Sequence, residues 1–129
     1  MINGPNMRQR YITDAVQTAS PAKLLLMLFD RLVLDLNRGE QALHDGNRAE
    51  ANTQLLHAQD IVTELHVSLD LDAWPGAPGL AAVYAFVETE LVNANTQGDA
   101  AKVTVVRGLI EPLRDTWREA ASAVSAAES

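Results

Sequence analysis

Apolar residues recur at every third or fourth position along four long stretches of the chain, and mostly polar residues lie between them. The most regular stretch has successive gaps of 3, 4, 3, 4, 3 and 4 residues, between Val103, Val106, Ile110, Leu113, Trp117, Ala120 and Val124. This spacing places the apolar side chains on one face of an α-helix, as in helices that pack side by side. The pattern therefore predicts long amphipathic helices rather than β-strands.

Glycine, proline and capping residues indicate where these helices begin and end. Ser20 followed by Pro21 is a typical helix start, because the serine hydroxyl caps the first turn and the proline lacks an N–H that would have no partner. Asn47 and Asp99 are the expected caps of two later helices. Breaks rich in Gly and Pro lie at 45–47, 70–79 and 96–99. The expected helices therefore span about 20–44, 47–69, 78–98 and 99–124.

Four long helices joined by short or moderate loops predict an all-α protein, an antiparallel four-helix bundle with a flexible or short-helical N-terminal segment. The expected division is an N-terminal segment at 1–19, the bundle at 20–124 and a frayed tail at 125–129. Pro112 lies inside the last helix and Gly108 precedes it by one turn, which predicts a kink at 108–112 rather than a break. The kink either is a local bend or shapes a groove.

Each helix carries more apolar residues than its seam requires, and the run Leu24–Phe29 is apolar throughout. A bundle helix can bury a stripe about 100° wide, which accounts for part of this surplus. Leu56, Ile61, Val105 and Leu109 are the hardest to place inside. The surplus therefore indicates either a wide core or a second apolar surface, such as a groove for a partner helix.

The composition limits which partners the protein can bind and which compartment it can occupy. The chain has 129 residues, a net charge of −7 and no cysteine. An acidic chain is a poor match for nucleic acid or an anionic membrane surface, and the lack of cysteine fits a reducing compartment. The N-terminal residues lack the apolar core of a secretory signal, and no apolar run is long enough to span a bilayer. We therefore expect a cytoplasmic protein without direct membrane insertion.

Catalytic and metal-binding patterns are weak in this sequence. His57, Asp60 and Glu64 share one helical face, but no second helix offers the Glu-x-x-His pair of a di-iron bundle. The chain has no Gly-rich phosphate loop and no nucleophile elbow. We therefore expect neither an enzyme nor a bound metal or cofactor.

The segment from Tyr11 to Asp30, with the pattern "Y….V.TASP..LL.MLFD", resembles the N-terminal signature of the flagellar secretion chaperone FliS family. Later segments are similar to the family in the same order: "AQDIVTELHVSLD" at 58–70, "GLAAVYAFVETELVNAN" at 79–95 and "LRDTW" at 113–117. The chain departs from the family at Phe29, where tyrosine is usual, and in the 70–79 loop, which contains Trp74.

The resemblance implies a bundle that binds newly made flagellin in the cytoplasm. It would hold the C-terminal segment of flagellin, prevent premature polymerisation and assist delivery to the flagellar type III export apparatus, whose gate components are further expected partners. Exposure and resemblance together suggest a client groove on the second, third and fourth helices, with Ile61, Leu65, Val87, Leu91, Val105 and Leu109. The alternative is a homo-oligomeric structural bundle that buries its apolar surplus between copies and has no flagellin client.

Tyr11 and Ile12 precede the first helix and have two possible roles. Family resemblance implies that this region influences flagellin binding and lies over the groove when no client is present. A hydrophobic staple in front of the helix would explain the tyrosine equally well.

Overall fold

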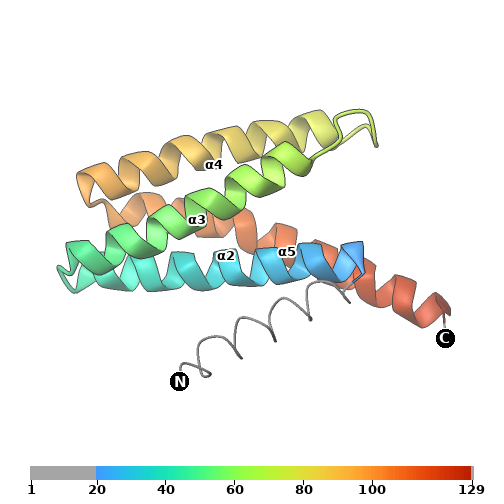
Figure 1. The fold of residues 1–129 in the computed structure, drawn as a ribbon, viewed down its shortest axis with the longest axis horizontal. Coiled ribbons are helices and arrows are strands. Elements are labelled where there is room, and N and C mark those ends of the chain that lie inside the picture. Colours follow the sequence, from blue (N-terminus) through green and yellow to red (C-terminus); the bar gives the residue numbers. More distant parts are fainter. Residues whose placement is uncertain (1–19, 129) are drawn as a thin grey trace, which may run out of the picture.

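The computed structural model describes the backbone of residues 20–128 and the side chains of residues 20–123. Four helices make up this part of the chain: α2 (Pro21–His44), α3 (Arg48–Ser68), α4 (Ala77–Gln97) and α5 (Ala100–Glu128). Both α2 and α4 pack against α3 and against α5, and successive helices run in opposite directions (Figure 1). The predicted all-α bundle is confirmed, while the predicted N-terminal segment at 1–19 falls outside the described residues.

Three of the four helices begin directly after the capping residues that the sequence indicated, and α4 begins at Ala77, one residue before its predicted start. The Ser20 hydroxyl accepts a hydrogen bond from the Lys23 N–H at 3.2 Å, and the Asn47 side chain accepts one from the Glu50 N–H at 3.1 Å. Asp99 likewise accepts one from the Ala101 N–H at 3.0 Å. These bonds satisfy N–H groups that have no partner within the first turn of a helix.

The last helix is longer than the sequence analysis predicted. It continues through Pro112 without a break and runs to Glu128, past the predicted end near Val124. Its final turns are rich in alanine, which has the highest helix propensity of any residue. In Figure 1 this end of α5 extends beyond the other three helices. The last part of its apolar seam therefore has no helix opposite it.

The seam residues of the four helices form one core. Phe29, Leu32 and Leu36 of α2 are fully buried, as are Val103, Val106 and Ile110 of α5. Leu113 and Trp117 continue the α5 seam but are only partly buried against this core. The core is therefore complete in the middle of the bundle and thins toward the end where α2 and α4 begin.

Four residues predicted to line an exposed client groove are buried in this core, although one of them, Leu65, also lines a pocket at the end of the bundle. Ile61 and Leu65 are 6% and 4% exposed, and Val87 and Leu91 are fully buried. Leu65, Val87 and Leu91 occupy seam positions, which face the axis of the bundle. Ile61 is buried beside Val62 because α3 has a neighbour on each flank and therefore buries a wide stripe. Their predicted position on an exposed surface is wrong.

Polar side chains also tie the helices together, in ways that periodicity did not reveal. Asp35 of α2 is fully buried, accepts a hydrogen bond from Arg31 at 2.9 Å and contacts the His57 ring of α3. Because His57 faces Asp35, it lies in the α2–α3 contact rather than in a ligand set with Asp60 and Glu64. A buried carboxylate needs such partners, since an unpaired buried charge is costly.

A second polar cluster joins α2 to α5. Glu40 accepts hydrogen bonds from the Thr104 hydroxyl at 2.7 Å and from the Arg107 guanidinium at 2.8 Å. Burial alone would raise the pKa of Glu40, but these hydrogen bonds and the nearby charges of Arg107 and His44 outweigh it and hold the pKa below its ordinary value. The α2–α5 side of the bundle is thus closed by charged and polar contacts.

Candidate functional site

The helices α4 and α5 present apolar side chains to solvent along the side where they meet. Phe86 of α4 is 46% exposed, and Val105 and Leu109 of α5 are 52% and 37% exposed. Val83 lies about one turn before Phe86, and Leu113 one turn after Leu109. We call these five residues the apolar strip.

Two contacts show that both halves of the strip face the same groove. Val83 and Leu113 line one pocket between the helices. Glu90, one turn after Phe86, pairs across the helices with Lys102, one turn before Val105, at 3.7 Å. The strip therefore runs along the α4–α5 groove from this pocket to the ion pair.

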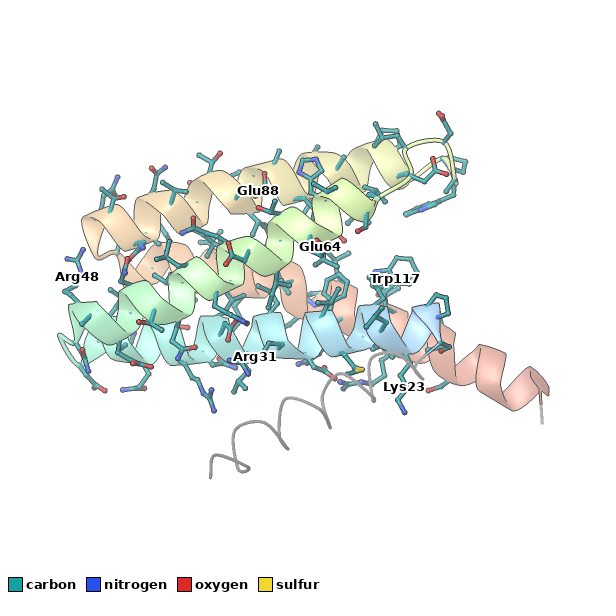
Figure 2. All side chains as sticks on the ribbon, viewed as in Figure 1. Lys23, Arg31, Arg48, Glu64, Glu88 and Trp117 are labelled. Atoms are coloured by element: carbon teal, nitrogen blue, oxygen red, sulfur yellow. The ribbon has the colours of Figure 1, made fainter. Side chains whose placement is uncertain are left out.

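Three neighbouring pockets lie at the end of the bundle where α2 and α4 begin and α5 extends beyond the other helices. Trp117 lines all three. The largest, about 640 Å³, opens between α4 and α5 and continues the apolar strip. A second of about 320 Å³ lies between α2, α3 and the start of α4, and a third of about 310 Å³ lies between α2 and α5. We call the three together the Trp117 cleft, and Figure 2 shows Trp117 beside the first turns of α2.

The apolar run at the start of α2 supplies one wall of this cleft. Leu24, Leu25 and Leu28 line the second pocket together with Leu65, Leu69 and Leu80. All residues from Leu24 to Leu28 are partly buried, whereas Phe29 is fully buried. The sequence left open whether this run belongs to a wide core or to a second apolar surface, and it contributes to both. Its seam residues pack on the core, and the same residues form a concave apolar surface.

The loop between α3 and α4 supplies the opposite wall through Trp74. This side chain is 44% exposed and lines both the first and the second pocket, so it lies where the two meet. Its ring lies over Gly76, where an added Cβ would come within 1.8 Å of a ring atom. Glycine at position 76 is therefore what lets the indole ring take this place.

Replacing Gly76 by alanine should displace the Trp74 ring, because no Cβ fits at 1.8 Å from it. We expect altered tryptophan fluorescence and a change in free energy of unfolding below about 1 kcal/mol, since the ring is half exposed and moves toward solvent. Gly79→Ala is the matched control, because nothing lies within 4 Å of its Cβ position. Equal spectra for Gly76→Ala and the wild type would contradict this account of the loop.

Tyr84 lies at the floor of the second pocket and is 2% exposed. Burial raises the pKa of its phenol to about 12 from the usual 10.0. Because the unfolded chain then loses this proton at a lower pH than the folded protein, the free energy of unfolding keeps its full value below pH 10 and falls as the pH rises from 10 to 12.

We expect the fold to lose about 2–3 kcal/mol over this interval, at about 1.4 kcal/mol per pKa unit. Urea unfolding at pH 9 to 12 measures the effect. Tyr84→Phe keeps the ring and removes the ionisable group, so the difference between the two proteins isolates Tyr84 from other groups that titrate there. Parallel pH profiles for the two proteins would rule out the burial effect.

The predicted site residues thus separate into three groups. Val105 and Leu109 lie on the apolar strip, while Ile61, Leu65, Val87 and Leu91 are in the core, where Leu65 also lines the second pocket of the cleft. Tyr11 and Ile12 lie outside the described residues. Sequence reasoning missed Trp74 and Trp117 as site residues, because one looked like a loop variation and the other like an ordinary seam position. The sequence did contain one signal for Trp117: the apolar seam of the last helix is longer than the seams of the other helices.

Among the residues that the structure describes, no group of three or more His, Cys, Asp or Glu side chains could hold a metal ion. Within the same residues, no helix is both long and apolar enough to cross a membrane. The main feature of the described surface is therefore its apolar groove and cleft, which suit the binding of an apolar or amphipathic partner.

Comparison with known proteins shows the family to which this chain belongs. The family model for the flagellar protein FliS matches residues 4–124. The chain belongs to the FliS family. It is 30% identical to the flagellar secretion chaperone FliS of Bacillus subtilis over 110 residues, covering 85% of this chain and 82% of the relative. The FliS of Escherichia coli is 31% identical, with 84% of this chain and 81% of the relative covered.

A solved structure agrees with the fold of this FliS family member. The crystal structure of a flagellar chaperone from bacteria superimposes with a TM-score of 0.73 at 18% identity, and the match covers 91% of this chain and 96% of that one. At this identity the likeness concerns the fold. FliS proteins are chaperones of flagellar export, a class not known to be enzymatic.

Proposed function

We propose that this protein is an export chaperone that binds the C-terminal segment of flagellin in the cytoplasm, prevents its premature polymerisation and assists its delivery to the flagellar type III export apparatus. The observation that carries the proposal is the apolar strip and Trp117 cleft, an exposed apolar surface on a member of a chaperone family. Exposed patches of this kind usually mark sites of protein interaction.

The shape of this surface fits an amphipathic helical segment. From Val105 to Trp117 the strip and cleft extend about 18 Å along α5, at 1.5 Å per residue. A helix laid in such a groove docks apolar side chains at intervals of three, four and seven residues. The strip offers contacts along its length and the cleft offers concave pockets at its end, so that one client helix can place several anchors.

Energy considerations favour a client that folds as it binds. A segment that is unstructured before binding must bury enough apolar area to offset the cost of ordering it. Large apolar and aromatic side chains such as Trp74, Phe86 and Trp117 provide much contact area from few residues. While bound, the apolar face of the flagellin segment is covered and cannot pack against other flagellin copies, which would prevent polymerisation without any chemical step.

Within this proposal, Val105 and Leu109 contact the client directly, and Trp117 and Trp74 hold its anchors. Tyr11 and Ile12 keep the role suggested by family resemblance, in which they influence binding and cover the groove in the absence of client. Components of the export gate are proposed as later partners of the loaded complex. The net charge of −7 fits a protein that must stay soluble while it exposes an apolar groove.

Calorimetric titration of the protein with flagellin, intact and without its C-terminal segment, tests the proposal. We expect a 1:1 complex with intact flagellin and little or no binding of the truncated form. The intrinsic fluorescence provides a second readout, because the chain has only two tryptophans and both line the cleft. Equal binding of the two flagellin forms would refute the mechanism. A stable oligomer that ignores flagellin in light scattering would instead favour the structural bundle.

A further inference from the structure

The second pocket of the Trp117 cleft combines an apolar floor with two acidic side chains. Six leucines contribute to its lining, and Glu64 and Asp70 belong to the same lining. Glu64 projects from α3, where Figure 2 labels it, and Asp70 begins the loop that leads to Trp74. We call this the acidic pocket.

Neither carboxylate has a cationic partner among the residues that the structure describes. Glu64 accepts a hydrogen bond from the Ser68 hydroxyl at 3.4 Å, and Asp70 accepts one from the Asp72 N–H at 2.9 Å. No described lysine or arginine lines this pocket or the larger one beside it.

The nearby cations of α5 are occupied elsewhere. Arg118 pairs with Asp30 of α2 at 2.6 Å, and Arg114 pairs with Asp115 at 3.1 Å. Among the described residues, no lysine or arginine forms a salt bridge with either carboxylate of the acidic pocket.

This arrangement restricts what can occupy the pocket. Glu64 and Asp70 are both exposed, so a client that fills the pocket with an apolar side chain comes close to the two carboxylates and displaces part of the water around them. Removing water from a charge is costly unless a partner of opposite sign is supplied. A lysine or arginine beside the apolar anchor supplies that partner, and its own aliphatic stem can lie along the leucines of the wall.

We propose that the acidic pocket binds an apolar anchor of the flagellin C-terminal segment that has a lysine or arginine next to it, and that Glu64 and Asp70 pair with that cation. This inference rests on the proposed function and adds the charge requirement of the client. The two carboxylates then set orientation and specificity, while the apolar contacts supply most of the affinity. A client with an acidic residue at that place binds more weakly, because like charges would face each other with no cation between them.

A double-mutant cycle tests the pairing directly. Peptides of the flagellin C-terminal segment, each with one Lys or Arg replaced by Gln, are titrated into wild type and into the E64Q/D70N variant. In wild type we expect one replacement to weaken binding roughly fivefold, the range for partly exposed ion pairs. In E64Q/D70N the same replacement should have almost no effect, and the unmodified peptide should bind roughly fivefold more weakly than to wild type.

The matched control is the D60N/D45N variant, which removes the same charge from exposed residues that line neither pocket. It should bind every peptide as wild type does. The fivefold effect should also shrink as salt rises from 0.05 to 0.5 M, because mobile ions screen exposed pairs.

Several outcomes would overturn the inference. One is the absence of coupling between any basic residue and the carboxylates; another is tight binding of a client segment that has no basic residue. Self-association of the free protein that E64Q/D70N abolishes would assign the pocket to a second copy. A fluorescence change on Arg8→Gln or Arg10→Gln in the free protein, absent in E64Q/D70N, would assign it to the N-terminal segment of this chain. Failure of intact flagellin to bind wild type would instead refute the proposed function itself.

Discussion

Replacing Trp117 by alanine is expected to weaken flagellin binding by at least tenfold and to leave the bundle folded. Trp117 lines all three pockets of the cleft, so its removal changes every concave part of the surface at once. Aromatic side chains at the centre of an interface commonly contribute 2 kcal/mol or more on truncation, which corresponds to roughly thirtyfold in affinity.

The expected cost in stability is much smaller than the loss of binding. Trp117 is only partly buried, and it packs against the edge of the core rather than within it. A fully buried tryptophan costs about 3–5 kcal/mol when replaced by alanine, so we expect about 1–2 kcal/mol here. Urea unfolding and calorimetric titration, performed on the same preparations, measure the two effects.

A matched control separates the cleft from apolar exposure in general. Leu56 on α3 is 47% exposed, similar to Phe86 and Trp74, but it lines none of the pockets. Leu56→Ala should bind flagellin as wild type does. If Leu56→Ala weakened binding as much as Trp117→Ala, the client would cover a different or far larger surface than the one proposed.

The starts of three helices and most of the core could be predicted from the sequence, because they depend on local rules. Ser20, Asn47 and Asp99 cap helices through bonds to N–H groups only two or three residues away. Seam positions follow from the period of the helix, and the residues at those positions in the middle of the bundle are buried. Neither inference needs knowledge of which helix lies next to which.

Which residues form the candidate site depends on how the helices lie beside one another, and the period of apolar residues in the sequence does not give this arrangement. Val105 and Leu109 are exposed because α4 and α5 leave a groove on that side, and Ile61 is buried because α3 is flanked on both sides. Both kinds of residue look alike in the sequence. Trp117 continues a regular seam, and the arrangement in space shows that the last helix extends beyond the other three. The buried Asp35 is a further case, since its partner His57 comes from another helix.

The second large effect concerns stability and distinguishes core from groove. Leu91 was expected to line the groove but is fully buried between the helices. Leu91→Ala should lower the free energy of unfolding by about 2–5 kcal/mol, the cost of a cavity in a packed core. Since bundles of this size are stabilised by about 5–15 kcal/mol, this is a large share of the total.

The comparison variant is Leu109→Ala, which removes the same atoms from a side chain that is 37% exposed on the apolar strip. We expect it to change stability by less than about 1 kcal/mol and to weaken flagellin binding severalfold. Leu91→Ala should show the reverse, with normal affinity for the fraction that remains folded. Leu91→Met, which nearly conserves volume and should cost less than about 1.5 kcal/mol, keeps the test valid if the alanine variant fails to fold.

The pair of variants therefore decides where the client lies. If both weaken binding in proportion to their loss of stability, flagellin recognises the folded bundle as a whole and the strip has no special role. If Leu91→Met lowers affinity without lowering stability, the core residues of α4 become accessible on binding, and the groove opens to admit the client. The closed core described for α4 leads us to expect neither result: binding should follow Leu109 and stability should follow Leu91, because one side chain faces the groove and the other faces the axis of the bundle.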